Sequence, residues 1–266
     1  MHRRTFLSLA GVCCLPATHL WAAPAAAGLS LPSAINKAGR QRMLSQRMAK
    51  AWLMLVLGVL PDKAKPLLTQ SISLFEQQLG ELKSFAPSDE VRAAFQQLEQ
   101  EWSRFRPLLA DLRSDPKAVW TVSEAALTAA QKLTQAYEKA AGTALGRLVN
   151  VSGRQRMLSQ RMAKAYFFRQ MGVNVTQAGE MLDAAVKEFA KAHEELKAAP
   201  QNSAHIKEEL ALVEQQWFFF QNALGMRDAG EQKRAATNVA TTSERILEQM
   251  NEVVGLYEKS ARDVEY

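Results

Sequence analysis

The chain has few of the residues that build disulfides, metal sites or loop-rich folds. Its two cysteines, Cys13 and Cys14, both lie in an N-terminal segment that reads as an export signal. We therefore expect the mature protein to have neither a disulfide nor cysteine chemistry. His193 and His205 are the histidines that follow this segment, and no Cys or His cluster accompanies them. We expect no metal site and no cofactor.

Other absences exclude whole classes of function. Beyond the N-terminal segment, no stretch is apolar enough to span a membrane, which takes ~20 residues. No nucleophile elbow, phosphate loop or paired-carboxylate pattern stands out, so we expect that the protein is not an enzyme. Glycine and proline number 13 and 9 in 266 residues, and residues that favour helices dominate. The composition predicts an all-α fold. The net charge of +6 is mild, and we expect no nucleic-acid partner.

Residues 1–27 have the layout of an export signal. Arg3 and Arg4 form a basic start, residues 6–15 are apolar, and small residues at 22–27 offer cleavage sites. The segment beginning at Arg3 also looks like a twin-arginine motif, which would mean export after folding. A general secretory signal is the other interpretation. Either route predicts a soluble periplasmic protein once the signal is cleaved.

A thirteen-residue segment occurs twice. Gly39–Ala51 returns unchanged as Gly153–Ala165, at an offset of 114. Chance does not reproduce thirteen positions, so the chain contains a duplicated module. We place the two copies at residues 31–145 and 146–266.

Each module is expected to form four helices with short connections. The first helices run over about 31–60, 63–85 and 90–113, and Thr121 with Glu124 resembles a capping box that opens the fourth. The second module repeats this order. The pattern is typical of two tandem up-down-up-down four-helix bundles.

The connection between the modules has two interpretations. Residues 137–153 contain no proline and no polar loop, but they do contain Gly142, Gly146 and Gly153. We favour one long shared helix that stacks the modules end to end and keeps their repeated segments far apart. A turn at the glycines would instead place the modules side by side.

The repeated segment carries a cation on an apolar helix face. An arginine is almost never fully buried without a partner, so one on a contact face needs an anion. A glutamate from a neighbouring helix is the simplest such partner, and a bound ligand is the alternative. The glycine one turn earlier would let a backbone or a small ligand approach closely. The face repeats at helical spacing through Ile35, Gly39, Arg42, Gln46, Ala49 and Leu53.

This segment resembles the signature helix of the PilJ-type sensor domain, found outside the membrane in type IV pilus chemoreceptors. It is also similar to the sensor domain of bacterial nitrate/nitrite sensor kinases, whose first helix carries an Arg-Met-x-Ser-x-Arg pattern. Residues 42–47 and 156–161 both match that pattern. The resemblance covers both modules through their four-helix plan, and the first helix is its specific part.

The resemblance implies a small oxyanion ligand, nitrate or nitrite first, held between first helices. The flat, weakly hydrated guanidinium fork suits such an anion. Arg42 and Arg156 would bind it, and Gly39 and Gly153 would allow the close approach. Ser45 and Ser159, one turn from these arginines, are candidate donors to the anion, and helix packing is the other interpretation of them. Arg47 and Arg161 are secondary candidates, since we favour solvation or ion pairing over a ligand role for them.

The resemblance also implies a homodimer through the first helix, and a signalling partner. The chain ends at Tyr266 with no apolar segment, so we expect it to report in trans to a membrane receptor or kinase. The alternative is a structural or adaptor module that docks to a pilus or receptor without a small ligand. Phe218 and Phe219 motivate it, because four successive helical residues at 217–220 cannot all face one core.

Overall fold

A computed structural model describes residues 29–225 and 231–264. The predicted export signal, residues 1–27, lies outside the described residues and stays a prediction. Within the described ranges the chain is helical, with no strand. The all-α class expected from the composition is therefore confirmed. The helices are α1 (Leu31–Val56), α2 (Pro61–Lys83), α3 (Asp89–Ala110), α4 (Pro116–Ala141), α5 (Ala144–Met171), α6 (Val175–Lys197), α7 (Ala204–Gly225) and α8 (Gln232–Val264).

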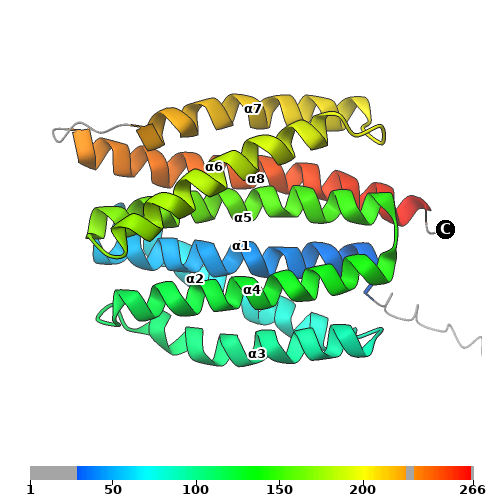
Figure 1. Cartoon of the computed structure of the whole chain (residues 1–266), viewed down its shortest axis with the longest axis horizontal. Helices are drawn as coiled ribbons and strands as arrows, with labels where there is room; N and C mark the ends of the chain where they lie inside the picture. The colour runs from blue at the N-terminus through cyan, green and yellow to red at the C-terminus, as the bar shows by residue number, and fades with distance from the viewer. Residues whose placement is uncertain (1–28, 226–230, 265–266) are drawn as a thin grey trace, which may run out of the picture.

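The first helices of the two modules lie side by side at the middle of the molecule (Figure 1). Helices α2 and α4 pack against α1, and α3 covers α4; in the same way α6 and α8 pack against α5, and α7 contacts α8. Helices α1 and α5 run in the same direction, and Ile35 near the start of α1 meets Gly146 near the start of α5. The modules are thus two four-helix units joined along their first helices.

The expected long helix between the modules is wrong, and the alternative turn is correct. Helix α4 ends at Ala141, and Gly142 adopts the left-handed conformation, with φ 61°. Glycine takes this conformation without steric cost and commonly ends a helix. Thr143 then caps α5, since its hydroxyl accepts a hydrogen bond from the Gly146 amide at 3.0 Å. A glycine stop followed by a threonine start reverses the chain in two residues.

The expected capping box at Thr121 is also wrong. Helix α4 begins earlier, at Pro116, and its cap is Asp115, whose carboxylate accepts from the Lys117 amide at 3.0 Å. Proline in the first turn suits a helix start because it lacks the amide hydrogen that would be unpaired there. Thr121 lies inside the helix and donates to the Lys117 carbonyl.

The two cores are built alike. Trp102 of α3 stacks on Phe75 of α2 at a ring distance of 4.3 Å, and Trp217 stacks on Phe189 at 4.4 Å. Both tryptophans are buried. Helices α1 and α5 are buried on almost every side, including their polar residues. The repeated segment therefore lies at the centre of the molecule and not on its surface.

Candidate functional site

Arg42 is fully buried between α1, α4 and α5, and it contacts neutral groups. Its Nη1 donates to the Gln131 side-chain oxygen of α4 at 2.6 Å, and its Nη2 donates to the backbone carbonyl of Asn150 in α5 at 3.2 Å. Its Nε has no partner among the described residues. Burial, followed by the charge of Arg154, lowers the pKa of Arg42 to about 9. The group is therefore cationic at neutral pH.

Arg156 occupies the matching position in the second module. Its Nη1 donates to Asn251 of α8 at 3.0 Å, and its Nη2 donates to the side-chain oxygen of Asn36 in α1 at 2.7 Å. It too is fully buried, and its Nε has no partner among the described residues. Burial and the nearby charges of Arg40 and Arg42 lower the pKa of Arg156. Each arginine thus donates a hydrogen bond to a residue of the other module.

The two guanidinium groups lie next to each other, within one chain. A Cβ atom placed on Gly153 would be 3.3 Å from Nη2 of Arg156 and 3.5 Å from Nη2 of Arg42. A Cβ atom on Gly39 would be 3.0 Å from Nη2 of Arg42. The glycines therefore give room to the guanidinium groups, where the sequence suggested room for a backbone or a ligand. No homodimer is required to bring two such arginines together.

The simplest expected partner, a glutamate, is not in contact with either arginine. Among the described residues, no carboxylate oxygen lies within 4.0 Å of Arg42 or Arg156. Glu258 and Glu138 lie one layer further out, where they accept hydrogen bonds from the amides of Asn36 and Asn150. The two glutamates therefore do not pair with the arginines directly, but bind the asparagines that the arginines contact. The side-chain oxygen of Asn150 is buried and has no partner within the described structure.

The serines of the motif form hydrogen bonds within their own helices. The hydroxyl of Ser45 donates to the carbonyl of Arg42 at 2.8 Å, and the hydroxyl of Ser159 donates to that of Arg156 at 2.8 Å. Both are fully buried. Their role toward a ligand stays a prediction, and it would require the hydroxyl hydrogens to turn away from these carbonyls.

Arg47 and Arg161 form ion pairs, in line with the less specific interpretation of these residues. Arg47 of α1 pairs with Glu244 of α8 at 2.5 Å, and Arg161 of α5 pairs with Glu124 of α4 at 2.7 Å. Each glutamate therefore belongs to the opposite module. We call these two contacts the inter-module ion pairs.

A lysine that the sequence interpretation missed completes each inter-module ion pair. Lys50 and Lys164 are fully buried, and each contacts its glutamate at 2.5 Å. Although burial acts to raise it, Lys50 and Arg47 hold the pKa of Glu244 at about 2. The available signal was the Ser-Glu pair at 123–124, which recurs at 243–244. Two separate layers of polar contacts thus join the modules, one at the arginines and one at these glutamates.

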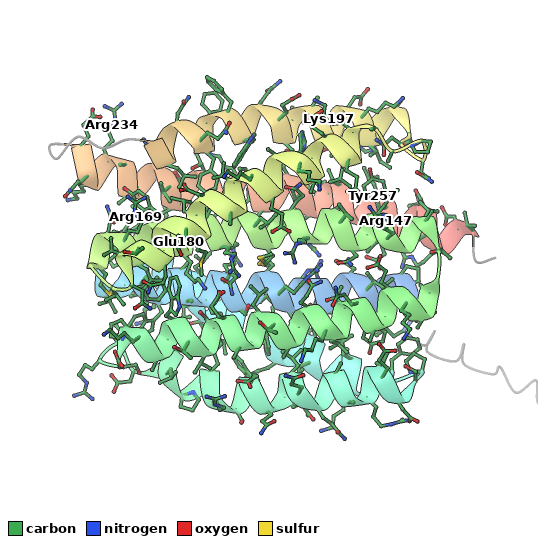
Figure 2. The ribbon with its side chains drawn as sticks, in the orientation of Figure 1. Arg147, Arg169, Glu180, Lys197, Arg234 and Tyr257 are labelled. Atoms are coloured by element: carbon green, nitrogen blue, oxygen red, sulfur yellow. The ribbon has the colours of Figure 1, made fainter. Side chains whose placement is uncertain are left out.

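Figure 2 shows side chains, nitrogen atoms among them, filling the space between α1 and α5. Among the described residues, no group of three or more His, Cys, Asp or Glu residues could hold a metal ion. The described helices also include none that is long and apolar enough to cross a membrane. The groups that could bind a ligand at the centre of the molecule are therefore cations and amides, and helices enclose them.

Comparison with known protein families identifies the repeat. The family described as the N-terminal part of type IV pili methyl-accepting chemotaxis transducers, PilJ, matches residues 29–128 and 140–244. The chain belongs to the PilJ family. No curated protein and no solved structure gave a match. Both PilJ repeats contain their central arginine, Arg42 or Arg156, within the matched range.

Membership in the PilJ family gives the protein a sensory or signalling role. The family is a sensory one and not a catalytic one, and its members signal with a membrane-associated partner. The two PilJ repeats also account for the tandem arrangement of the helices, since each match begins at or just before the first helix of a module.

Proposed function

We infer that the protein is a periplasmic sensor that binds one small oxyanion, nitrate or nitrite first, between Arg42 and Arg156, and reports to a separate membrane receptor or kinase. The observation that carries this proposal is the juxtaposition of two fully buried guanidinium groups whose direct partners are amides and carbonyls. Its sensory part follows from PilJ membership.

The physical argument concerns charge. Two like charges buried a few ångströms apart repel each other strongly in a medium of low dielectric constant. An anion between them removes that repulsion and gives each fork a charged acceptor. The nitrogen atoms that have no partner in the described structure, Nε of Arg42 and of Arg156, supply spare donors. A flat anion with charge spread over three oxygens suits two flat forks.

The burial of both arginines has a consequence for signalling. A ligand cannot reach a fully buried pair unless the contact between α1 and α5 opens. Ligand binding is then coupled to how the two PilJ repeats sit against each other. Such differential binding to two arrangements is what a sensor needs.

Calorimetry tests this proposal directly. The mature protein is titrated with nitrate, and then with nitrite, chloride and sulfate. Arg42→Met and Arg156→Met keep much of the side-chain volume and remove the charge, so each is expected to abolish nitrate binding. Arg147→Ala is the matched control, because this exposed arginine lies on α5 as well. Nitrate binding that survives both methionine substitutions would place the ligand elsewhere.

A second candidate function is docking to a protein partner, as the alternative adaptor role requires. At least one of Phe218 and Phe219 was expected to lie outside the core, and both residues of α7 are exposed, by 62% and 55%. The matching residues of the first PilJ repeat are Ser103 and Arg104. Phe218→Ser with Phe219→Arg restores that pattern. If docking is the function, this variant loses binding to the receptor, and the complex of the unmodified protein with the receptor forms equally well with and without nitrate.

A further inference from the structure

A cavity of about 520 Å³ lies at one end of the second PilJ repeat. It is formed where the end of α5 meets the start of α6, the end of α7 and the start of α8. A volume of this size is typical of sites for small molecules. The residues on which the following argument depends are Tyr166, Arg169, Leu182, Asp183, Val186 and Leu224.

The cavity combines an apolar wall with two opposite charges. Leu182, Val186 and Leu224 supply the wall. Arg169 and Asp183 border the same space, and neither forms an ion pair with any residue in the described ranges. Exposed charges are usually just solvated, but here two opposite charges without an ion-pair partner in the described ranges border one cavity beside an apolar wall. It fits a ligand that carries both signs.

Tyr166 adds a polar group to the lining of this cavity. It is largely buried, and its hydroxyl accepts a hydrogen bond from the Gln170 amide at 3.1 Å. Burial raises the pKa of the Tyr166 phenol, and the charge of Arg169 acts against that shift. Arg169 follows Tyr166 by three residues, so the two lie on one face of α5, at the end where Figure 2 labels Arg169.

The first PilJ repeat offers a natural comparison, because the offset of 114 holds through this region. Trp52 stands where the second repeat has Tyr166, and it is fully buried with its indole nitrogen donating to the Asp111 carbonyl at 3.1 Å. Leu55 and Thr69 replace Arg169 and Asp183. The first repeat thus has a larger side chain and no charge at these positions. Duplication and divergence have placed both charges in one copy alone.

We propose that this cavity binds a small zwitterion with an apolar side chain, of the α-amino acid class. The carboxylate would pair with the fork of Arg169, and the ammonium group with the carboxylate of Asp183. The side chain would lie on Leu182, Val186 and Leu224. This site shares no residue with the arginine pair at the centre of the molecule, so each site can be tested independently of the other.

Calorimetry with leucine as the probe tests the assignment on the mature chain. Two analogues separate the charges: 4-methylpentanoate lacks the ammonium group, and 3-methylbutylamine lacks the carboxylate. Leucine is expected to bind at least about tenfold more tightly than either analogue. No heat of binding with leucine, or equal affinity for an analogue, would overturn the proposal.

Exchange of residues between the repeats gives the matched variants. Arg169→Leu and Asp183→Thr each install the residue of the first PilJ repeat at a position that is exposed here, so the fold is expected to tolerate both. Each should weaken leucine binding at least about tenfold and leave the nitrate response unchanged. Arg42→Met should leave leucine binding intact. Leucine affinity that neither exchange alters would place the ligand outside this cavity.

Discussion

The two PilJ repeats are alike where they face each other and different where they face outward. Thirteen residues of α1 and α5 are identical, and so are the contacts by which Lys50 and Lys164 reach the other repeat. On the outer surface, the exposed Ser103 and Arg104 of the first repeat are replaced by the exposed Phe218 and Phe219. Near the ends of α1 and α5, the buried Trp52 is replaced by Tyr166. A surface that must match its own copy tolerates little change, whereas the outer surfaces can acquire separate tasks.

The largest expected effect comes from breaking an inter-module ion pair. Glu244→Gln removes the charge that Arg47 and Lys50 share, and Lys50 is then a buried, unpaired cation. Loss of one partner from such a pair typically costs about 3–5 kcal/mol. Glu124→Gln should cost the same, because Arg161 and Lys164 repeat the arrangement. Urea unfolding measures both; clearly unequal losses would mean that the repeats are not equivalent at this layer.

The same ion pairs predict an acid dependence of stability. The pKa of Glu244 is held at about 2 in the folded protein, below its ordinary value of 4.5. A carboxyl group of this kind contributes stability above its unfolded pKa and loses it as the pH falls toward its folded pKa. The free energy of unfolding should therefore decrease as the pH falls from about 5 toward 2. In Glu244→Gln the decrease should be shallower.

The number of bound ions distinguishes one shared site from two separate ones. If Arg42 and Arg156 hold one anion between them, calorimetry gives one nitrate per chain. A single Arg42→Met or Arg156→Met change then removes all binding, at a cost of at least about 2 kcal/mol. Two independent sites would instead leave one nitrate per chain in each single variant. That outcome would show that the close approach of the arginines has no functional meaning.

Much of the architecture follows from the sequence alone, because it depends on local chemistry and on a repeat. Helical composition and the thirteen-residue duplication predict tandem all-α modules, and the family match and the fold confirm them. The turn at Gly142 was less visible, since three glycines without a polar loop suit a helix or a stop. Thr143 caps α5 and so fixes the turn, but in the sequence this cap is signalled by a single side chain.

The partners of the central arginines could not be predicted from the sequence. Arg42 reaches Asn150, 108 residues away, and Arg156 reaches Asn36, 120 residues away. No periodicity relates positions in different modules, so these contacts depend on how the modules dock. The inter-module ion pairs illustrate the same limit: Glu124 and Glu244 stand out as a repeat, but nothing in the sequence indicates that each serves the opposite module.

A smaller effect is expected from filling the space beside one arginine. In Gly39→Ala the new methyl group meets Nη2 of Arg42 at 3.0 Å, so the guanidinium group must shift. The contacts at Gly153 are longer, 3.3 and 3.5 Å. Gly39→Ala should therefore weaken nitrate binding more, by about tenfold or 1.4 kcal/mol. Calorimetry of both variants checks the order, with Gly179→Ala of α6 as a control that meets no neighbour within 4 Å.

An effect of similarly small size tests the turn between the repeats. Gly142→Ala forces a side chain into the left-handed conformation, which costs roughly 1–2 kcal/mol for an L-residue. Gly80→Ala, in the exposed interior of α2 with nothing within 4 Å, should instead gain up to about 1 kcal/mol, because alanine favours a helix. Urea unfolding should thus give opposite signs for the two variants. If Gly142→Ala were also stabilising, α4 would tend to continue into α5, and the side-by-side arrangement on which the arginine pair depends would be a weak preference of the chain.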